Sequence, residues 1–199
     1  MTLSVRQIFR RIEEDCVDES IQELIRDMKA TQHGDRVNPF YELMKDYHKE
    51  GGVWKHTVIA LEALPVLSKA LTKEFNDQEY TLLYDAYKNE LRSAALYHDI
   101  GKLVTQTPSK TRPGSYSFPG HQEGKVVAEV AEQYGISLSP MVKGLIAHHH
   151  DSPEQASKLP VESLKLLIIL KAVDNIAVGP RTEAEAIDHI RPFVATATV

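Results

Sequence analysis

The amino-acid sequence predicts an all-α protein, a helical bundle with additional helices at its N-terminus. Apolar residues recur at helical spacing along most of the chain, and the alternation of apolar and polar residues that marks a half-buried strand is nearly absent. Polar segments rich in proline and glycine separate the periodic stretches. Each helix therefore has an apolar face that packing against its neighbours can bury.

Residues 1–50 are expected to form a helical extension. Apolar stripes over residues 5–16 and 21–28 predict two helices. Residues 29–38 are polar and predict a loop, and a short helix is expected over residues 40–49 before two glycines break it.

Residues 51–190 are expected to form the main domain. A long apolar pattern over residues 53–71 predicts a helix that is kinked or interrupted at Pro65, and residues 80–98 predict another helix. Residues 104–120 are rich in proline, glycine, serine and threonine and predict a long surface loop. Further helices are expected near residues 121–134, 139–150, 161–178 and 181–190, and a tail is expected over residues 191–199.

The composition is that of an ordinary globular protein, with 42% apolar and 26% charged residues. A formal net charge of −5 argues against binding a long nucleic-acid duplex but is compatible with a small phosphorylated ligand. The one cysteine, Cys16, excludes an internal disulfide and fits a reducing compartment. No stretch of 18 apolar residues occurs, so we expect a cytoplasmic protein without a membrane partner. The sequence leaves a homo-oligomer open.

Two polar residues end the helix expected over residues 80–98. His98 and Asp99 follow Ala94 and Ala95 by one helical turn, so they continue the apolar face of that helix. Because burying polar groups without partners is costly, this position predicts that they bind something. A satisfied polar pair that closes the helix is the alternative.

The residues that follow are expected to turn the chain back. Gly101 can adopt the left-handed conformation that ends a helix. Such a turn would direct Lys102 toward whatever His98 and Asp99 bind.

A carboxylate and a further histidine occupy other apolar stripes. Asp174 lies within the run LLIILKAVDNIA, where a partly buried carboxylate needs a metal or another cation. A salt bridge to Arg181 or Lys102 is an equally good explanation. His56 continues an apolar face of the helix over residues 53–71, where a core histidine with a local hydrogen bond is the alternative.

Three consecutive histidines can be separated by helix geometry. The buried face of their helix is defined by Val142, Leu145 and Ile146. At ~100° per residue, His149 falls near the centre of that face, while His150 and His148 lie roughly 90° and 110° to either side. His149 is therefore the best ligand candidate, His150 can reach the same centre at a fraying helix end, and His148 is expected to face solvent.

The remaining histidines differ in their settings. His121 ends the long loop and precedes a helix rich in small and β-branched residues, so it is a candidate ligand, with an exposed loop histidine as the alternative. The histidines expected at the surface are His33, His48 and His189.

These groups together predict a metal centre. Imidazoles and carboxylates without thiolates favour Mn, Fe, Co, Ni or Zn. Asp99 has two oxygens and could bridge two divalent cations, which would activate a water for attack on a phosphoryl group. One metal site would comprise His56, His98, Asp99 and Asp174, and the second would comprise His121 and His149 with His150 as a further candidate.

A basic segment accompanies the expected metal centre. Between Ile100 and Gln122 there is no acidic residue, but there are three basic residues, Lys102, Lys110 and Arg112. These side chains are the candidate substrate-binding residues, and Lys102 would also neutralise charge on the phosphate.

The ordered histidines and aspartates resemble the HD superfamily, in which HDIGK is a frequent spelling. Their set is similar to that of the binuclear branch, and the resemblance covers about residues 50–178. The motifs GGVWKHT, YHDIGK, FPGHQEG and LIAHHHDS look like those in the HD domains of 3′–5′ exoribonucleases and tRNA nucleotidyltransferases. The resemblance implies hydrolysis of a phosphomonoester or phosphodiester with a divalent metal. No Gly-Tyr-Pro segment follows His150, so cyclic-di-GMP specificity is not predicted.

Three functions follow from these observations. The leading hypothesis is a phosphohydrolase acting on a nucleotide, cyclic nucleotide or short oligonucleotide, with Asp99 and Lys102 as catalytic residues. The second is a mixed-valent di-iron oxygenase on the same scaffold. The third is a regulatory domain that binds a partner and contains a structural metal.

Overall fold

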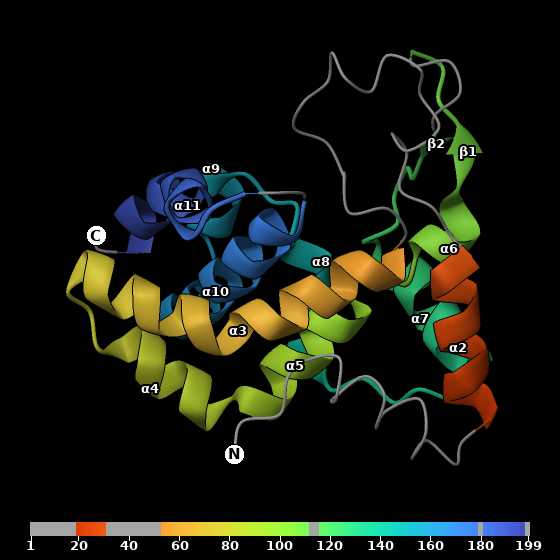
Figure 1. Ribbon diagram of the computed structural model, residues 1–199, viewed down its shortest axis with the longest axis horizontal. Coiled ribbons are helices and arrows are strands. Elements are labelled where there is room, and N and C mark those ends of the chain that lie inside the picture. The colour runs from red at the N-terminus through yellow and green to blue at the C-terminus, as the bar shows by residue number, and fades with distance from the viewer. Residues whose placement is uncertain (1–18, 31–52, 112–115, 179–180, 198–199) are drawn as a thin grey trace.

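The computed structural model describes residues 19–30, 53–111, 116–178 and 181–197, and it confirms the all-α prediction (Figure 1). The helices are α2 (Glu19–Ala30), α3 (Val53–Phe75), α4 (Glu79–Ala86), α5 (Lys88–Tyr97), α6 (Lys102–Thr105), α7 (Gly124–Gln133), α8 (Pro140–His148), α9 (Pro153–Ala156), α10 (Val161–Ala177) and α11 (Glu183–Ala197). The strands are β1 (Thr107–Pro108) and β2 (Tyr116–Ser117).

Helix α10 is the centre of the bundle. It packs against α3 and α11, between which Figure 1 places it, and also against α4, α5 and α8. Its sequence is apolar on nearly every side, and a helix of this kind is stable only when other helices surround it. Lys165 is an exception whose ammonium donates to Asp77 Oδ2 at 2.7 Å and to Glu79 Oε2 at 2.5 Å, which ties α10 to the start of α4.

Helix α3 continues through Pro65, so of the kink or interruption predicted there, the interruption does not occur. Pro65 lies on the exposed face of the helix. Water can replace the backbone N–H that proline lacks on that face, while the buried residues on the opposite face keep the helix in place.

The prediction of a single helix over residues 80–98 is also wrong, because the chain forms two helices there, α4 and α5, separated at Tyr87. Tyr87 has φ −113° and ψ 28°, which lies outside the helical region. Its hydroxyl donates to Glu162 Oε1 at 2.6 Å, a contact with α10 that no local pattern reveals.

The segment predicted as a long surface loop over residues 104–120 contains secondary structure. It begins within the short helix α6 and contains the antiparallel pair β1–β2, in which Thr107 lies opposite Ser117. Helix α9, which was not predicted, begins at a capping box formed by Ser152 and Gln155.

The helices predicted near the two ends of the chain differ in their outcome. In α2, Leu24, Ile25 and Met28 are buried, which confirms the helix predicted over residues 21–28. The other elements expected within residues 1–50 lie outside the described residues. Helix α11 continues to Ala197, so residues 191–197 are helical rather than the expected tail.

The burial of Phe193 explains this extension. Its side chain is 5% exposed, and the Lys171 ammonium lies 4.4 Å from the centre of its ring. We expect Phe193→Ala to lower the free energy of unfolding by about 3 kcal/mol, because it removes a buried aromatic ring. Urea denaturation would measure this change. Val66→Ala, at a side chain that is 54% exposed, should change stability little, and equal effects of the two variants would contradict the burial of α11.

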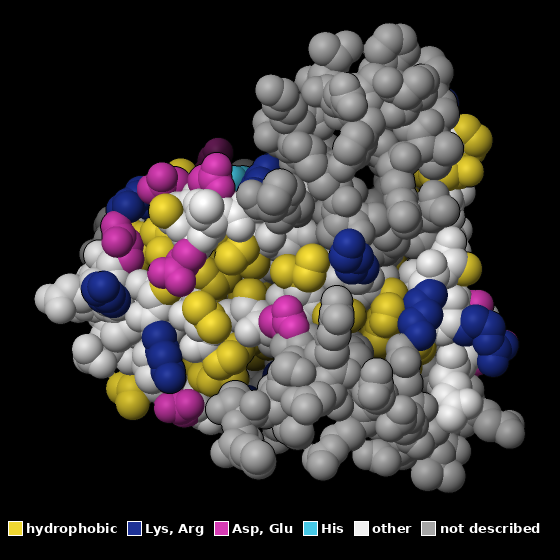
Figure 2. Space-filling model, in the orientation of Figure 1, with side chains coloured by type: hydrophobic (Ala, Val, Ile, Leu, Met, Phe, Trp, Pro, Cys, Tyr) yellow, Lys and Arg dark blue, Asp and Glu magenta, His cyan; other side chains and the backbone are white. Residues whose placement is uncertain are grey.

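The surface of the face shown in Figure 2 carries mixed charge. Hydrophobic side chains gather along its middle, over α3 and α4, and charged side chains of both signs surround them. Among the described residues of this face there is no continuous basic strip of the kind that tracks a nucleic-acid duplex. No helix within the described residues has the length and apolar character needed to cross a membrane.

Candidate metal centre

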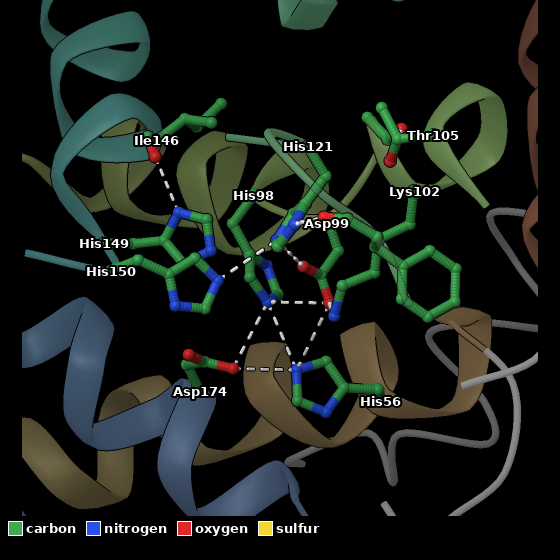
Figure 3. A network of polar contacts seen from close by, with 12 residues as sticks. His56, His98, Asp99, Lys102, Thr105, His121, Ile146, His149, His150 and Asp174 are labelled. Carbon is green, nitrogen blue, oxygen red and sulfur yellow. Dashed lines mark hydrogen bonds and ion pairs between the residues drawn. The ribbon is translucent and has the colours of Figure 1, made fainter. Parts of the chain in front are cut away.

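Seven side chains predicted from the sequence to bind metal lie together (Figure 3); five of them are buried, Asp174 is partly buried and His150 is exposed. They come from the first turn of α3, the end of α5, the loop before α7, the end of α8 and the last turns of α10. They are His56, His98, Asp99, His121, His149, His150 and Asp174.

One half of the cluster is formed around His56. Its Nε2 atom lies 2.9 Å from Asp174 Oδ1 and 3.2 Å from His98 Nε2. Asp99 Oδ2 lies 3.4 Å from His98 Nε2 and completes a group of four converging donor atoms. Both imidazoles are fully buried, and Asp174 keeps 22% of its side-chain surface exposed.

The other half is formed by His121, His149 and His150. His121 Nε2 lies 3.1 Å from His150 Nε2. Each of the three offers one ring nitrogen, and these nitrogens lie within 4.8 Å of one another. Helix geometry favours His149 and His150 over His148 as ligands, and both lie in this half.

Asp99 connects the two halves. Its Oδ2 faces His98 and His56, whereas its Oδ1 lies 3.3 Å from His121 Nε2. The carboxylate is 1% exposed. This orientation allows one oxygen to serve each half, as a bridging ligand between two cations would.

Backbone carbonyls orient three of the imidazoles in the same way. The Nδ1 atoms of His98, His121 and His149 each lie within 2.9 Å of the carbonyl oxygen three residues earlier, of Ala95, Phe118 and Ile146. A carbonyl oxygen only accepts, so each Nδ1 must carry the proton and donate it. His98 and His149 directly follow the last residues of α5 and α8, where carbonyls lack the usual donor four residues later; the Ile146 carbonyl also accepts from the backbone N–H of His149. In the neutral form, each Nε2 lone pair therefore points into the cluster.

The surroundings of His149 Nε2 indicate whether these residues fit a metal ion. Its Nε2 is buried and has no hydrogen-bond partner among the described residues. Burial, followed by the nearby His150 and His98, lowers the pKa of His149 well below its ordinary value, so the imidazole is neutral near pH 7. A buried, unpartnered lone pair is what a divalent cation would satisfy.

The spacing of the donor atoms is also suitable. Ligands that bind one cation at about 2.0–2.2 Å lie roughly 3 Å from one another. The close pairs in the cluster are separated by 2.9 to 3.5 Å. The oxygen and nitrogen donors without thiolates suit first-row transition metals.

The two carboxylates are held in their charged form. Burial acts to raise the pKa of Asp99, but Lys102 and the surrounding histidines outweigh it and hold this pKa well below its ordinary value. For Asp174 burial likewise acts to raise the pKa, and the neighbouring His56 and His98 lower it well below the ordinary value. Both groups are thus ionised at neutral pH.

Lys102 forms an ion pair with one of these carboxylates. Its Nζ donates to Asp99 Oδ2 at 2.8 Å, and its side chain is 8% exposed. The salt bridge considered for Asp174 is therefore not made by Lys102, which pairs with Asp99, and Asp174 contacts His56 and His98 instead.

Comparison with known proteins identifies the family. A family model described as HD domain matches residues 53–179, which is more than half of the chain and includes all seven candidate ligands. The chain belongs to the HD domain family. Membership supports metal-dependent phosphohydrolase activity in general. A search of curated proteins and a search of solved structures found no match.

Gly101 in the HD motif has a different conformation and a different structural role from those predicted. Its φ is −61° and its ψ is −19°, so it is right-handed, and the predicted left-handed conformation is wrong. A Cβ atom at this position would lie 1.9 Å from the carbonyl oxygen of His121. The HD domain needs glycine here because the backbone that carries His121 passes directly against it.

Lys110, one of the predicted substrate-binding residues, does not share the close contacts that Lys102 makes with the centre. Lys110 is exposed beyond β1, and the described contacts of the cluster do not include it. Arg112 lies outside the described residues. His148 faces away from the cluster, with Nδ1 2.7 Å from Asp151 Oδ2 and a side chain that is 42% exposed.

A group of residues beside the candidate metal centre was not predicted from the sequence. A cleft of about 480 Å³ is lined by His149, His150 and Asp174 together with Lys171, Asn175 and His189. His189 was expected only to be a surface residue, and it is exposed but faces this cleft. The available signal was Lys171, a lysine inside the apolar run LLIILKAV. The positions of His33 and His48 lie outside the described residues.

Proposed function

We propose that this HD domain hydrolyses a small phosphorylated substrate, namely a nucleotide, a cyclic nucleotide or a short oligonucleotide, with two divalent transition metals as cofactors. The observation that carries the proposal is the pair of donor clusters joined by Asp99 beside a nearly buried lysine. Two clusters of nitrogen and oxygen donors next to a cation match the needs of a phosphoryl-transfer site.

The proposed ligands divide according to the two halves of the cluster. His56, His98 and Asp174 would hold one ion, His121, His149 and His150 would hold the other, and Asp99 would bind both. The donor set is compatible with Mn, Fe, Co, Ni or Zn. Bound metals would supply a water acidic enough to attack at neutral pH and positive charge for the phosphoryl oxygens.

The remaining chemistry is attributed to the side chains of the chain. The charge of Lys102 keeps Asp99 ionised and places a positive group where charge develops on the phosphate. The carbonyls that bond to Nδ1 of His98, His121 and His149 keep these rings fixed, so that little reorganisation is needed during the reaction. We further propose that Lys110 and Arg112 attract the substrate anion from the loop.

A hydrolysis assay tests this function. Protein stripped of metal and reloaded with Mn²⁺ should release product from p-nitrophenyl phosphate, bis-p-nitrophenyl phosphate or a panel of nucleotides and dinucleotides, and chelator should abolish the release. Oxygen uptake measured in the same samples should be absent; uptake coupled to substrate loss would favour an oxygenase. No hydrolysis by protein shown to contain metal would overturn the proposal.

The adjacent residues His148 and His149 can be compared to test which of them binds metal. His149→Ala is expected to lower the Mn²⁺ bound per chain to about half, because it removes a ligand of one ion. His148→Ala removes an imidazole of the same helix end that faces Asp151 and should leave the metal content unchanged. Equilibrium dialysis followed by elemental analysis measures both values. Equal metal contents of the two variants would contradict the assignment of His149.

A further inference from the structure

The two proposed ligands at the end of α8 lie in a turn rather than within the helix. Helix α8 ends at His148, so His149 and His150 begin the connection to α9, which starts at Pro153. Such a turn lacks the continuous ladder of backbone hydrogen bonds that keeps a helix rigid. Contacts from other elements can therefore decide how precisely these two imidazoles are placed.

Lys171 of α10 provides such a contact. Its ammonium donates to the carbonyl oxygen of His149 at 2.7 Å and to that of Asp151 at 3.0 Å, and the residue is 7% exposed. The two carbonyls belong to the residues on either side of His150 in the chain, so one ammonium restrains the backbone before and after this histidine. The lysine thus ties the turn to α10, the helix that also carries Asp174.

A lysine at this position is costly unless its contacts are useful. It lies in the apolar run LLIILKAV, where a leucine would pack without a polar group to satisfy. Lys165, six residues earlier on α10, is buried to the same degree, but it pairs with two carboxylates at α4. The acceptors of Lys171 are instead two backbone carbonyls, one of which belongs to a proposed metal ligand.

Phe193 of α11 also contacts this ammonium. The Lys171 Nζ lies over its ring at 4.4 Å from the centre, and the ring is 5% exposed. The face of an aromatic ring attracts a cation, so this contact holds the lysine in place. Helix α11 lies beyond residues 53–179, the range that matches the HD domain family. A helix outside that range is therefore connected to the turn through one lysine.

We propose that Lys171 is a positioning residue for one of the two ions: it fixes the turn that carries His149 and His150, and Phe193 keeps its ammonium in place. The inference rests on the two-metal function proposed above. It gives α11 a part in metal binding, although no residue of this helix is a proposed ligand.

Stepwise binding of Mn²⁺ tests this role without reference to activity. Equilibrium dialysis over a range of Mn²⁺ concentrations gives an apparent Kd for each ion. Lys171→Met keeps an apolar stem but removes the ammonium, so it should raise the Kd of one ion at least about tenfold and leave the other within about threefold. Unchanged Kd values would overturn the inference. A rise of both Kd values by the same factor would also overturn it, since that indicates a general loss of structure.

Lys165→Met is the matched control. It removes an equally buried ammonium from the same helix, so it should lower the temperature of thermal unfolding. Both Kd values should nevertheless stay within about threefold of the wild-type values, because the described contacts of Lys165 are made at α4. If Lys165→Met weakened one ion as much as Lys171→Met does, the inference would be wrong.

A double variant shows whether the lysine acts through the turn. His149→Ala is expected to retain one ion, and the addition of Lys171→Met should leave the Kd of that ion within about threefold. A larger rise would contradict an action through His149.

Phe193→Leu keeps the inference testable if Lys171→Met does not fold. This variant replaces the ring by another apolar side chain and should raise the Kd of the same single ion at least about threefold. Unchanged Kd values for both ions in Phe193→Leu would overturn the inference.

The outcome for the proposed function can be distinguished from these results. Two bound ions without hydrolysis of any substrate would overturn the phosphohydrolase proposal, and the Kd values would still decide on Lys171. Binding of fewer than two ions by the wild-type protein would overturn both proposals.

Discussion

Gly101→Ala is expected to reduce hydrolysis about 100-fold, although the substitution adds one methyl group outside the set of ligands. The new Cβ would lie 1.9 Å from the carbonyl oxygen of His121, so the backbone that carries this imidazole must move. A displacement of about 1 Å at a catalytic group can lower the rate by about 100-fold. The same movement should weaken the half of the cluster formed by His121, His149 and His150. Activity and metal content of the reloaded protein measure the two effects.

Gly144→Ala is the matched control for this variant. Gly144 lies within α8, and a Cβ added there meets no atom within 4 Å. Alanine in a helix interior stabilises relative to glycine by about 0.5–1 kcal/mol, so the control should be at least as stable as the wild-type protein and equally active. Normal activity and metal content in Gly101→Ala would show that the close approach of His121 is not needed.

Asp99→Asn is expected to remove both metals and to lower hydrolysis at least about 1,000-fold. The amide has nearly the same size but no charge, and its NH₂ end cannot bind a cation, so it can no longer bridge two metals. The substitution also leaves Lys102 without the carboxylate that it contacts at 2.8 Å, in a position that is 8% exposed. Removal of one partner of a buried ion pair costs about 3–5 kcal/mol, so stability should fall as well.

Asp77→Asn separates the loss of metal from the loss of an ion pair. Asp77 also accepts from a nearly buried lysine, Lys165 at 2.7 Å, but it lies at the start of α4, and the described contacts of the metal cluster do not include it. Its variant should be destabilised while it keeps its metal content and kcat. Elemental analysis and thermal unfolding of both variants give the comparison. Retention of both metals in Asp99→Asn would disprove the bridging role.

Much of the candidate site could be predicted because its residues stand on periodic apolar faces. His56, His98, Asp99 and Asp174 each continue a stripe of buried residues, and a polar group at such a position must have a partner. The choice of His149 over His148 rested on the same angle of about 100° per residue. These are relations between residues within one helix, and the chain encodes them locally.

Other features depend on contacts between distant segments. The break at Tyr87 accompanies a hydrogen bond to Glu162 on α10, and the cleft lined by Asn175 forms only where α11 lies beside α10. Helical periodicity continues across Tyr87, so the pattern alone could not divide α4 from α5. The sequence likewise does not show that the buried amide oxygen of Asn175 lacks a hydrogen-bond partner among the described residues.

The sequence by itself determined the all-α class, the order of the ligands and the HD motif, because helical periodicity and residue chemistry are properties of short segments. The tertiary structure alone decided how these segments approach one another. In the folded chain the two oxygens of Asp99 face different histidines, and the backbone of His121 lies directly against Gly101. Both depend on separations of a few ångströms between residues that are far apart in the chain, and such separations are fixed by packing rather than by local pattern.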